Sequence, residues 1–483
     1  MQLYLHKLGA ATAKDSYEIG KDFVRIAEVF VDVHSSGLVL VTVQKGDGGE
    51  FELYLKGKSG TWTQLATYED RAVQAFFGEK NDLYVLSRKA APRGKLLRAP
   101  IAGFDLQKAK VVLPEAKDTL VSDVWDDGVL LVHGGRIFAT YQLGGPSEIR
   151  TFDLDGKSKP GPKVLPVSSA ANLTALGKAD VLYSNVSFVE PLGWYSYAAK
   201  GGATSKHKIS TKTPVDLAGV SVTREMAVSK DGTQVPVNIL LPAGHKPGTP
   251  IPFLVTGYGG YGVNIEPSFQ AQRSVFLALG VGLAIVNLRG GAEYGEDWHQ
   301  AGALTKKQNV FDDFIGAIEH LKQKHASKVA ITGGSNGGLL MGAVLTQRPE
   351  LITVATSLVG IYDMLRVETE PNGAFNTTEF GSVTDKAQFE ALYAYSPFHH
   401  VKDGSAYPPT LMLTGANDVR VAPWHSRKMI ARMQAASAST SPLLLMTTFD
   451  AGHGMGSSVD QLVEQSTDAY AFMMHHLGVP MTN

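Results

Sequence analysis

The stretch VAITGGSNGG at residues 329–338 decides the fold of this chain. Its first four residues are apolar or β-branched and predict a short buried strand. Glycines then surround Ser335 on both sides, and residues 339–347 (LLMGAVLTQ) predict a helix with an apolar face. A strand, a tight turn and a helix in this order would hold the serine in a strained backbone conformation. The turn would point the serine hydroxyl out of the sheet, toward the N–H groups at the start of the helix.

This arrangement is typical of the nucleophile elbow of an α/β-hydrolase, in which the serine sits on a sharp turn between a strand and a helix. The alternative interpretation is a glycine-rich turn that contains a serine by chance, because the short string alone is not specific. Partner residues further along the chain have to decide between the two interpretations.

Two later residues could activate Ser335. A serine hydroxyl is a poor nucleophile at neutral pH, so it needs a histidine base that a carboxylate holds in the right tautomer. Asp418 follows a predicted strand at residues 410–414, and His453 follows another at residues 443–448. Taken alone, Asp418 could be a turn residue and His453 a surface histidine. Their order and their joint placement after strands predict a catalytic triad.

An oxyanion hole is the next requirement, because hydrogen-bond donors must meet the charge that develops on the substrate carbonyl oxygen. The backbone N–H of Asn336, the residue after the serine, is the expected first donor. The loop after a predicted strand at residues 252–256 would supply the second donor, and Tyr258 in that loop could offer its phenol. The alternative role of Tyr258 is packing under a glycine turn.

Composition excludes several classes of function. The 483 residues are 44% hydrophobic and 19% charged, as in globular proteins, and the length suits two or three domains. The formal net charge of −1 gives no basis for binding nucleic acid or an anionic membrane surface. Cysteine is absent, which excludes disulfides, thiolate catalysis and cysteine-ligated metals. We expect no cofactor and no metal site.

The sequence predicts no targeting segment. No apolar run approaches the roughly 18 residues of a membrane span. The first ten residues, MQLYLHKLGA, lack the apolar core of a signal peptide. The chain as given is therefore expected to be cytoplasmic, and a periplasmic or secreted location stays open if the N-terminus is incomplete.

Residues 1 to about 215 predict only β-structure. Short apolar or alternating runs, separated by turn-forming residues, lie at residues 37–43, 52–55, 82–86, 128–133, 149–154, 181–185 and 194–197. Similar leucine-tyrosine segments, LYLHKL, LYLKGK and LYVLSR, suggest a repeated surface-facing strand. At roughly 40–50 residues per blade, the region would hold about four or five blades of a propeller. An irregular β-sandwich is the alternative.

Strands and helices alternate after residue 220. Residues 224–241 predict a hairpin around an Asp-Gly turn. Strands are then predicted at residues 252–256, 282–287, 329–332, 410–414 and 443–448, and helices at residues 311–325, 339–347, 424–436 and 463–477. This alternation predicts a doubly wound, mostly parallel sheet. The predicted domains are a shortened β-propeller-like domain at residues 1–217 and an α/β-hydrolase catalytic domain at residues 218–483.

Six segments in the second half of the chain resemble the successive motifs of the prolyl oligopeptidase family. They are VTGYGGYG, NLRGGAEYGEDWHQAG, KKQNVFDDF, GGSNGG, TGANDVRVAP and AGHGMG. The resemblance implies a β-propeller joined to an α/β-hydrolase domain. It implies Ser335 as nucleophile, His453 as general base and Asp418 as the acid that orients the base. It also implies that Tyr258 and the Asn336 N–H form the oxyanion hole.

The same resemblance implies a substrate pocket. Arg420 matches the arginine that holds a carbonyl of a peptide substrate. The pocket for the residue before the scissile bond would be lined by Tyr261, Ile361, Phe380 and Val421. Where the family has an indole that stacks on the substrate proline, this chain has Asn376, with Phe375 beside it. This departure argues against strict specificity for proline.

The start of the chain is the second departure from the family. The resemblance begins inside the propeller, so the propeller is expected to be open or shortened. Unpaired strand edges in an open ring need cover, which symmetric association commonly supplies. We therefore expect a homodimer with the β-region in its interface, and an accessible active site.

Three functions are compatible with these features. The leading one is a serine peptidase of the prolyl oligopeptidase type, which cleaves short peptides through an acyl-enzyme. The second is a carboxylesterase that hydrolyses small acyl or aryl esters with the same triad. The third is a propeller interaction module with a vestigial hydrolase domain, against which the complete set of triad residues argues.

Overall fold

The computed structural model describes residues 1–125, 127–454 and 457–480. These residues form two compact units, each with its own hydrophobic core. Unit 1 contains residues Met1–Val186, Leu192–Thr211 and Tyr294–Asp297. Unit 2 contains residues Ser187–Pro191, Lys212–Glu293 and the described chain from Trp298 onward.

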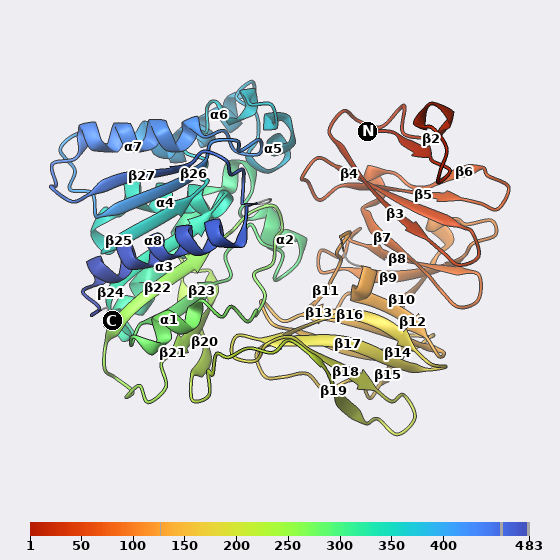
Figure 1. Cartoon of the computed structure of the whole chain (residues 1–483). Coiled ribbons are helices and arrows are strands. Elements are labelled where there is room, and N and C mark those ends of the chain that lie inside the picture. The colour runs from red at the N-terminus through yellow and green to blue at the C-terminus, as the bar shows by residue number, and fades with distance from the viewer. Residues whose placement is uncertain (126, 455–456, 481–483) are drawn as a thin grey trace. The chain divides into compact units, whose positions relative to one another are not determined.

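Unit 1 is built from antiparallel β-sheets that follow one another along the chain (Figure 1). In the described residues, four of these sheets have four or five strands, and a two-stranded sheet precedes them. The strands, sheet by sheet, are β1 Leu3–Leu5 and β2 Ser16–Ile19; β3 Ala27–Val33, β4 Val39–Lys45, β5 Phe51–Lys56 and β6 Trp62–Ala66; β7 Ala72–Phe77, β8 Asp82–Ser87, β9 Lys95–Pro100 and β10 Lys110–Leu113; β11 Thr119–Leu120, β12 Leu130–His133, β13 Arg136–Gln142, β14 Ser147–Asp153 and β15 Ser158–Lys159; and β16 Ser168–Leu176, β17 Asp180–Ser187, β18 Gly193–Tyr197 and β19 Thr204–Ser210. The all-β character of this region is confirmed.

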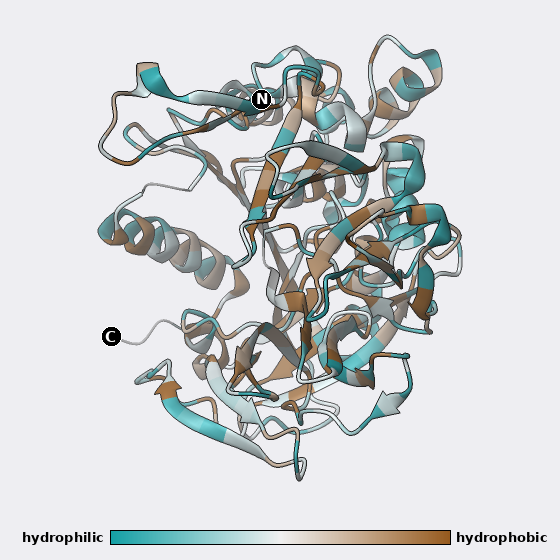
Figure 2. Cartoon of the chain, turned by 90° about the vertical axis from the view of Figure 1, so that its right-hand side faces the viewer, coloured by the Kyte–Doolittle hydropathy of each residue, from teal (hydrophilic) through white to brown (hydrophobic). Residues whose placement is uncertain are grey.

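Hydrophobic cores lie between successive sheets of unit 1. The alternation along each strand buries one of its faces, and in β5 (FELYLK) the buried side chains are Phe51, Leu53 and Leu55. One cluster joins the first two four-stranded sheets, a second joins the next pair, and a third joins the last pair. Figure 2 shows the hydrophobic residues that recur along the strands. Sheets that pack face to face in chain order are typical of a propeller.

The leucine-tyrosine segments do not mark one repeated position, so the expected repeat is wrong. The first lies in β1, the second in β5, which is third in its sheet, and the third in β8, which is second in its sheet. The second and third segments do not face the surface either, because Leu53, Leu83 and Tyr84 are at most 1% exposed. The segments share the composition of a half-buried strand, and this composition does not report where in a sheet the strand lies.

A single eight-stranded sheet forms the centre of unit 2, in the order β20-β21-β23-β22-β24-β25-β26-β27. β20 and β21 form the predicted hairpin, and β21 runs antiparallel to β23. Every pair of neighbours from β23 to β27 is parallel, so the predicted sheet is confirmed. The strands are β20 Ser221–Val228, β21 Gln234–Leu241, β22 Ile251–Gly257, β23 Gly282–Val286, β24 Ala326–Gly334, β25 Val354–Leu358, β26 Thr410–Gly415 and β27 Leu443–Thr448.

Helices cover both faces of this sheet, and α8 lies across one of them (Figure 1). Successive residues of β24 define the faces: Val329 and Ile331 pack in the core with α3 and α4, whereas Thr332 lines a cavity with Met473 of α8. The helices are α1 Arg273–Ala278, α2 Glu296–Gln300, α3 Gln308–Lys324, α4 Asn336–Gln347, α5 Gly373–Phe380, α6 Lys386–Tyr395, α7 Trp424–Ala436 and α8 Val459–Leu477. Within the described ranges, none of them combines the length and the apolar character that a bilayer span requires.

Candidate active site

Ser335 forms the turn between β24 and α4. β24 ends at Gly334 and α4 begins at Asn336, so the serine alone connects the strand to the helix. Its backbone has φ 58° and ψ −121°, a sparsely populated conformation that costs of the order of 1–3 kcal/mol. A Cβ atom on Gly333 would lie only 2.5 Å from the Gly337 carbonyl oxygen, so the turn requires a glycine there. The predicted strand, turn and helix are confirmed.

The three predicted triad residues lie at one edge of the sheet. Ser335, Asp418 and His453 follow the carboxyl ends of β24, β26 and β27, which belong to the parallel part of the sheet. His453 Nδ1 lies 2.6 Å from Asp418 Oδ2. Because an ionised carboxylate only accepts hydrogen bonds, Nδ1 carries the proton of this pair, which leaves Nε2 of the neutral imidazole as an acceptor. Met455 and Gly456 of the AGHGMG motif lie outside the described residues.

The turn that contains Asp418 orients its carboxylate. Oδ1 accepts the backbone N–H groups of Arg420 and Val421, each at 2.9 Å. Oδ2 faces His453, and the Asp418 side chain is fully buried while that of His453 is 15% exposed. Aspartate commonly bonds to its own backbone two residues further on, which is why this residue type suits the turn. Each carboxylate oxygen therefore has a separate set of partners.

The loop after β22 brings Tyr258 to the serine turn. The side-chain amide of Asn336 donates a 2.6 Å hydrogen bond to the Tyr258 carbonyl oxygen. This close approach depends on Gly260, since a Cβ there would lie 2.6 Å from Asn336 Nδ2. Asn336 is the first residue of α4, so its backbone N–H has no acceptor within the helix. A direct hydrogen bond thus joins the two residues predicted for the oxyanion hole.

Three of the predicted pocket residues contact one another. The Tyr261 hydroxyl donates to Asn376 Oδ1 at 2.9 Å. The Tyr261 ring meets the Phe380 ring edge-on, with the ring centroids 5.6 Å apart. Asn376 and Phe380 both come from α5 and are buried. The hydrogen bond fixes the orientation of the Asn376 side-chain amide.

The other predicted pocket residues have different environments. Ile361 and Val421 are buried in the hydrophobic core of unit 2. Phe375 is half-buried on α5, and the Arg420 side chain is exposed. Ile361 and Val421 thus share one apolar core with Phe380 and Tyr261.

A buried ionic network that the sequence analysis missed supports the Tyr258 loop. Lys307 and Glu379 are both fully buried, with Nζ and Oε1 2.7 Å apart. Lys307 Nζ also donates to the Gly259 carbonyl oxygen at 2.9 Å, and His299 Nε2 lies 2.8 Å from Glu379 Oε2. Burial raises the pKa of Glu379, but Lys307 and His299 outweigh it and leave that pKa below its ordinary value. Lys307 and Glu379 are 72 positions apart, so no local pattern reveals their contact.

Glu293 is a further buried acid in unit 2. Its Oε1 atom accepts the Ile265 N–H and the Asn287 side-chain amide, each at 3.1 Å. Burial raises the pKa of Glu293 to about 7 in spite of these bonds. The folded protein therefore penalises the charged form of this acid near neutral pH.

The parallel sheet and the strained serine turn at the end of one of its central strands define an α/β-hydrolase. Two family models match the chain, one in the β-sheet region of unit 1 and one in the α/β region of unit 2. The model of the prolyl oligopeptidase family matches residues 267–480, and the model of the N-terminal β-propeller domain of prolyl oligopeptidase matches residues 1–210. The chain belongs to the prolyl oligopeptidase family, and it is a serine peptidase of that type.

Known relatives align with nearly the whole chain. The prolyl endopeptidase of Elizabethkingia meningoseptica is 32% identical over 492 residues, which cover 99% of this chain and 68% of the relative. A solved prolyl endopeptidase, from an analysis of two such enzymes and their inter-domain dynamics, is 32% identical with a TM-score of 0.91, and the match covers 99% of this chain and 70% of that one. Prolyl oligopeptidase B from Galerina marginata, bound to a 35mer substrate of hydrolysis and macrocyclization, is 25% identical with a TM-score of 0.90, and the match covers 100% of this chain and 68% of that one.

Proposed function

We propose that the chain hydrolyses short peptides with Ser335 as nucleophile, His453 as general base and Asp418 as the acid that orients the base. The observation that carries this proposal is the 2.6 Å bond between His453 Nδ1 and Asp418 Oδ2, at the sheet edge where Ser335 is also held. The bond selects the tautomer in which His453 Nε2 can take a proton. No other part of the described chain combines these groups with a strained serine turn.

The reaction would proceed through an acyl-enzyme. His453 Nε2 takes the proton of the Ser335 hydroxyl as Oγ attacks the substrate carbonyl carbon. The imidazolium then donates that proton to the leaving amine as the peptide bond breaks. Water repeats the attack with His453 as base, and the acid product leaves with Ser335 restored. Asp418 stays ionised and stabilises the imidazolium at each stage.

Two donors would meet the negative charge on the carbonyl oxygen. The first is the backbone N–H of Asn336, which has no acceptor in α4. The second is the phenol of Tyr258, whose carbonyl oxygen accepts a 2.6 Å hydrogen bond from the side-chain amide of Asn336. Donors fixed in advance stabilise the transition state without reorganising, and each typically contributes about 10²–10³ in kcat.

The pocket would accept residues other than proline before the scissile bond. An amide offers no π-face of the size of an indole, and Asn376 Oδ1 is already bonded to the Tyr261 hydroxyl. Phe375, Ile361, Phe380 and Val421 would supply apolar walls, and Arg420 would hold a substrate carbonyl. We therefore infer a preference for small apolar residues, with proline among them.

A carboxylesterase is the second candidate, and Asn376 is the observation that favours it. The same triad cleaves esters, and a pocket without an indole has less to gain from the proline of a peptide. Side-by-side kinetics on a chromogenic proline peptide amide and a short-chain aryl ester separate the two functions. A peptidase should have the higher kcat/KM on the amide, although we expect turnover of both substrates.

We also propose that the chain forms a homodimer through its β-region. Exposed apolar side chains near the start of unit 1 support this proposal: Leu5 of β1 is 60% exposed, Leu8 in the turn after β1 96% and Val33 of β3 66%. Exposed apolar groups of this kind mark interaction surfaces when they cluster. Light scattering at micromolar concentration measures the oligomeric state, and a monodisperse monomer would contradict the proposal. The cytoplasmic compartment stays a prediction from the sequence.

Covalent labelling tests the proposed catalytic role directly. A fluorophosphonate probe should modify the wild type at Ser335 and should fail to modify Ser335→Ala. Ser274→Ala, at the partly buried start of α1, is the matched control and should label like the wild type. A wild-type protein that stays unlabelled would support the third hypothesis from the sequence, a propeller interaction module with an inactive hydrolase domain.

A further inference from the structure

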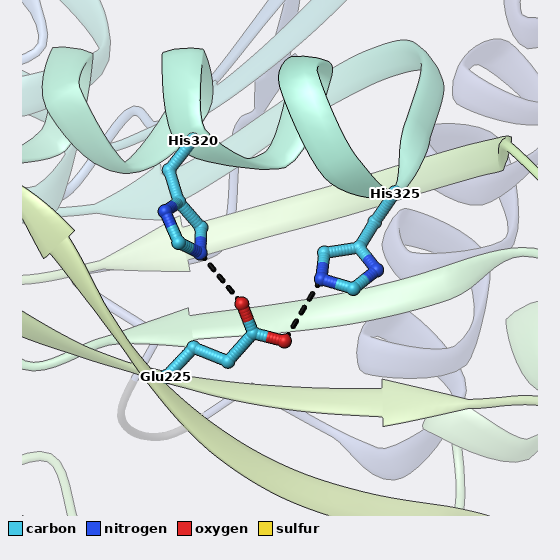
Figure 3. A group of neighbouring side chains, drawn as sticks. All are labelled: Glu225, His320 and His325. Atoms are coloured by element: carbon cyan, nitrogen blue, oxygen red, sulfur yellow. Dashed lines mark hydrogen bonds and ion pairs between the residues drawn. The ribbon is translucent and has the colours of Figure 1, made fainter. Parts of the chain in front are cut away.

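A cluster of three potential metal ligands lies between the edge strand β20 and the end of α3 in unit 2. Glu225 comes from β20, which among the described strands pairs with β21 alone. His320 lies in the last turns of α3, and His325 follows the end of that helix. Figure 3 shows both imidazole rings directed from the helix toward the Glu225 carboxylate. None of these residues belongs to the proposed catalytic machinery.

The ligand atoms of the cluster converge on one small volume. His320 Nε2 is 2.7 Å from Glu225 Oε2, and His325 Nε2 is 2.9 Å from Glu225 Oε1. All the ligand atoms lie within 4.8 Å of one another. In a tetrahedral site, two atoms bound to one zinc ion at about 2.0–2.2 Å are about 3.3–3.6 Å apart, so small side-chain rotations that separate the hydrogen-bonded atoms suffice to enclose an ion.

The main chain that carries these side chains is fixed. The His325 N–H donates to the Leu321 carbonyl oxygen at 2.7 Å, and the His325 carbonyl oxygen accepts the Ile251 N–H at 3.0 Å. The side chains are partly buried, with exposed fractions of 11% for His320, 21% for His325 and 26% for Glu225. The site is therefore held in place and still open to an ion from solvent.

We propose that Glu225, His320 and His325 bind one divalent zinc ion, with water at the fourth position. Two imidazole nitrogens and one carboxylate oxygen are a donor set that zinc accepts readily, whereas Mg²⁺ and Ca²⁺ prefer oxygen ligands alone. Binding would replace the proton on each Nε2 with the metal. In a neutral ring that proton moves to Nδ1, and in a charged ring it passes to solvent. The sequence alone does not reveal this cluster, because Glu225 and His325 are 100 positions apart and form no spacing motif.

The competing explanation is an ion-pair network without a metal. Burial raises the pKa of Glu225, but hydrogen bonds from His320 and His325 outweigh it and keep the carboxylate ionised. Lys324 Nζ also lies 3.5 Å from Glu225 Oε2, and this side chain is 55% exposed. A metal would push Lys324 into solvent, so the lysine opposes metal binding and contributes only to the metal-free network. Removing Lys324 should therefore strengthen zinc binding if the cluster is a metal site, and should only weaken the ion-pair network if it is not.

The position of the cluster points to a structural role. β24 begins at Ala326, directly after His325, and ends at Gly334, directly before Ser335. The metal would thus lie at the opposite end of this strand from the serine, about 30 Å away at 3.3 Å per residue. It would clamp β20 to the end of α3. Binding should raise the thermal unfolding midpoint by several degrees at saturating zinc and leave the rate of peptide hydrolysis per labelled site unchanged.

Calorimetric titration of the tag-free, chelator-treated protein with zinc chloride tests this proposal. The wild type should bind one equivalent with a dissociation constant in the micromolar range or below. Glu225→Gln, His320→Gln and His325→Gln should each weaken binding at least tenfold. Lys324→Gln should strengthen binding, because a repelling ammonium has gone.

Two controls separate this cluster from other zinc ligands. His207→Gln, an exposed histidine on β19, should bind zinc like the wild type. His453→Gln should also retain binding, which shows that the ion is not held by the histidine next to Asp418. Cobalt should give the visible absorption of a four-coordinate site in the wild type, and this signal should be lost in His325→Gln.

Three results would overturn the proposal. One is the absence of saturable binding below about 1 mM zinc, which corresponds to weak surface affinity. The second is unchanged affinity in the three cluster variants, and the third is loss of binding only in His453→Gln. Fluorophosphonate labelling confirms that the three cluster variants, Lys324→Gln and His207→Gln are folded, and thermal unfolding does so for His453→Gln. If one histidine variant does not fold, the other two cluster variants and Lys324→Gln still decide.

Discussion

Substitution of Asp418 by asparagine tests the proposed role of the acid without removing its shape. In the folded protein Oδ1 accepts two backbone N–H groups, so the asparagine carbonyl oxygen must occupy that position. The side-chain NH₂ group would then face His453 Nδ1. Because two donors cannot share a hydrogen bond, Nδ1 would have to become an acceptor and the proton would move to Nε2. The histidine could then no longer accept the proton of Ser335.

The expected loss follows from two contributions. Asp418 stabilises the imidazolium that forms during the reaction, and two unit charges about 4 Å apart interact by about 4 kcal/mol at an effective dielectric constant of 20. Recovering the reactive tautomer breaks the new hydrogen bond, which costs about another 1 kcal/mol. A total of about 5 kcal/mol corresponds to a loss of about 10⁴ in kcat.

Steady-state hydrolysis of a proline peptide amide measures this loss, and thermal unfolding checks the fold. Asp418→Asn should keep the wild-type unfolding midpoint within a few degrees, because its backbone partners are retained. Asp450→Asn is the matched control: this exposed carboxylate accepts from Gln461 at 2.8 Å and should not affect kcat. More than about 10% of wild-type kcat in folded Asp418→Asn, against the loss of about 10⁴ expected for a wrong tautomer, would refute the proposed role.

Substitutions at three further positions give expected outcomes. Ser335→Ala should lower kcat by about 10⁴–10⁶, and Ser335→Gly should be equally inactive. Ser335→Gly should be more stable to urea than Ser335→Ala by about 1 kcal/mol, since glycine tolerates φ 58°. Equal stability of the two variants would show that the turn is not strained. Tyr258→Phe should lower kcat by about 10–10³ with little change in KM, because the phenol would act only on the transition state; unchanged kcat in stopped-flow measurements would remove it from the oxyanion hole. Folding raises the pKa of Glu293 from 4.5 to about 7, so its contribution to stability is complete below pH 4.5 and is lost as the pH rises through 7. The free energy of unfolding of Glu293→Gln, measured in urea, should therefore rise by up to about 3 kcal/mol relative to that of the wild type between pH 4.5 and pH 8. A difference between the two proteins that does not vary with pH would contradict the raised pKa.

Much of the hydrolase fold could be predicted because its elements are locally distinct. Buried parallel strands are largely apolar runs, so the strand predicted at residues 410–414 lies within β26, all of whose residues are buried. α7 also begins and ends where its pattern predicts. β25 (VATSL) has only five residues and two hydroxyl side chains, so it gave no comparable signal, and hydrogen bonds to β24 and β26 define it.

The helix at Gly373–Phe380 shows why other elements could not be predicted. Its sequence GAFNTTEF contains β-branched residues and no regular apolar face, so intrinsic preference does not favour a helix. Tertiary contacts compensate: Glu379 binds Lys307, and Phe380 packs on Tyr261. A single-sequence pattern does not contain such contacts.

The same distinction holds for the site. Ser335, Asp418 and His453 could be placed because each follows a recognisable strand, and parallel strands bring their carboxyl ends to one edge. The ion pair of Lys307 with Glu379 could not be anticipated, because each residue reads as an ordinary charged surface residue. Only the folded chain shows that both are buried and paired.

The turn at Asp418–Val421 has a consequence for redesigning specificity. Its two backbone N–H groups fix the carboxylate that holds His453, and the same two residues, Arg420 and Val421, carry the side chains assigned to substrate contact. A library of substitutions at these positions would therefore change the rate constant together with the substrate preference, since any shift of the turn moves the acid. Altered selectivity without loss of turnover is better sought on α5, at Phe375 and Asn376, which share no backbone bond with the acid.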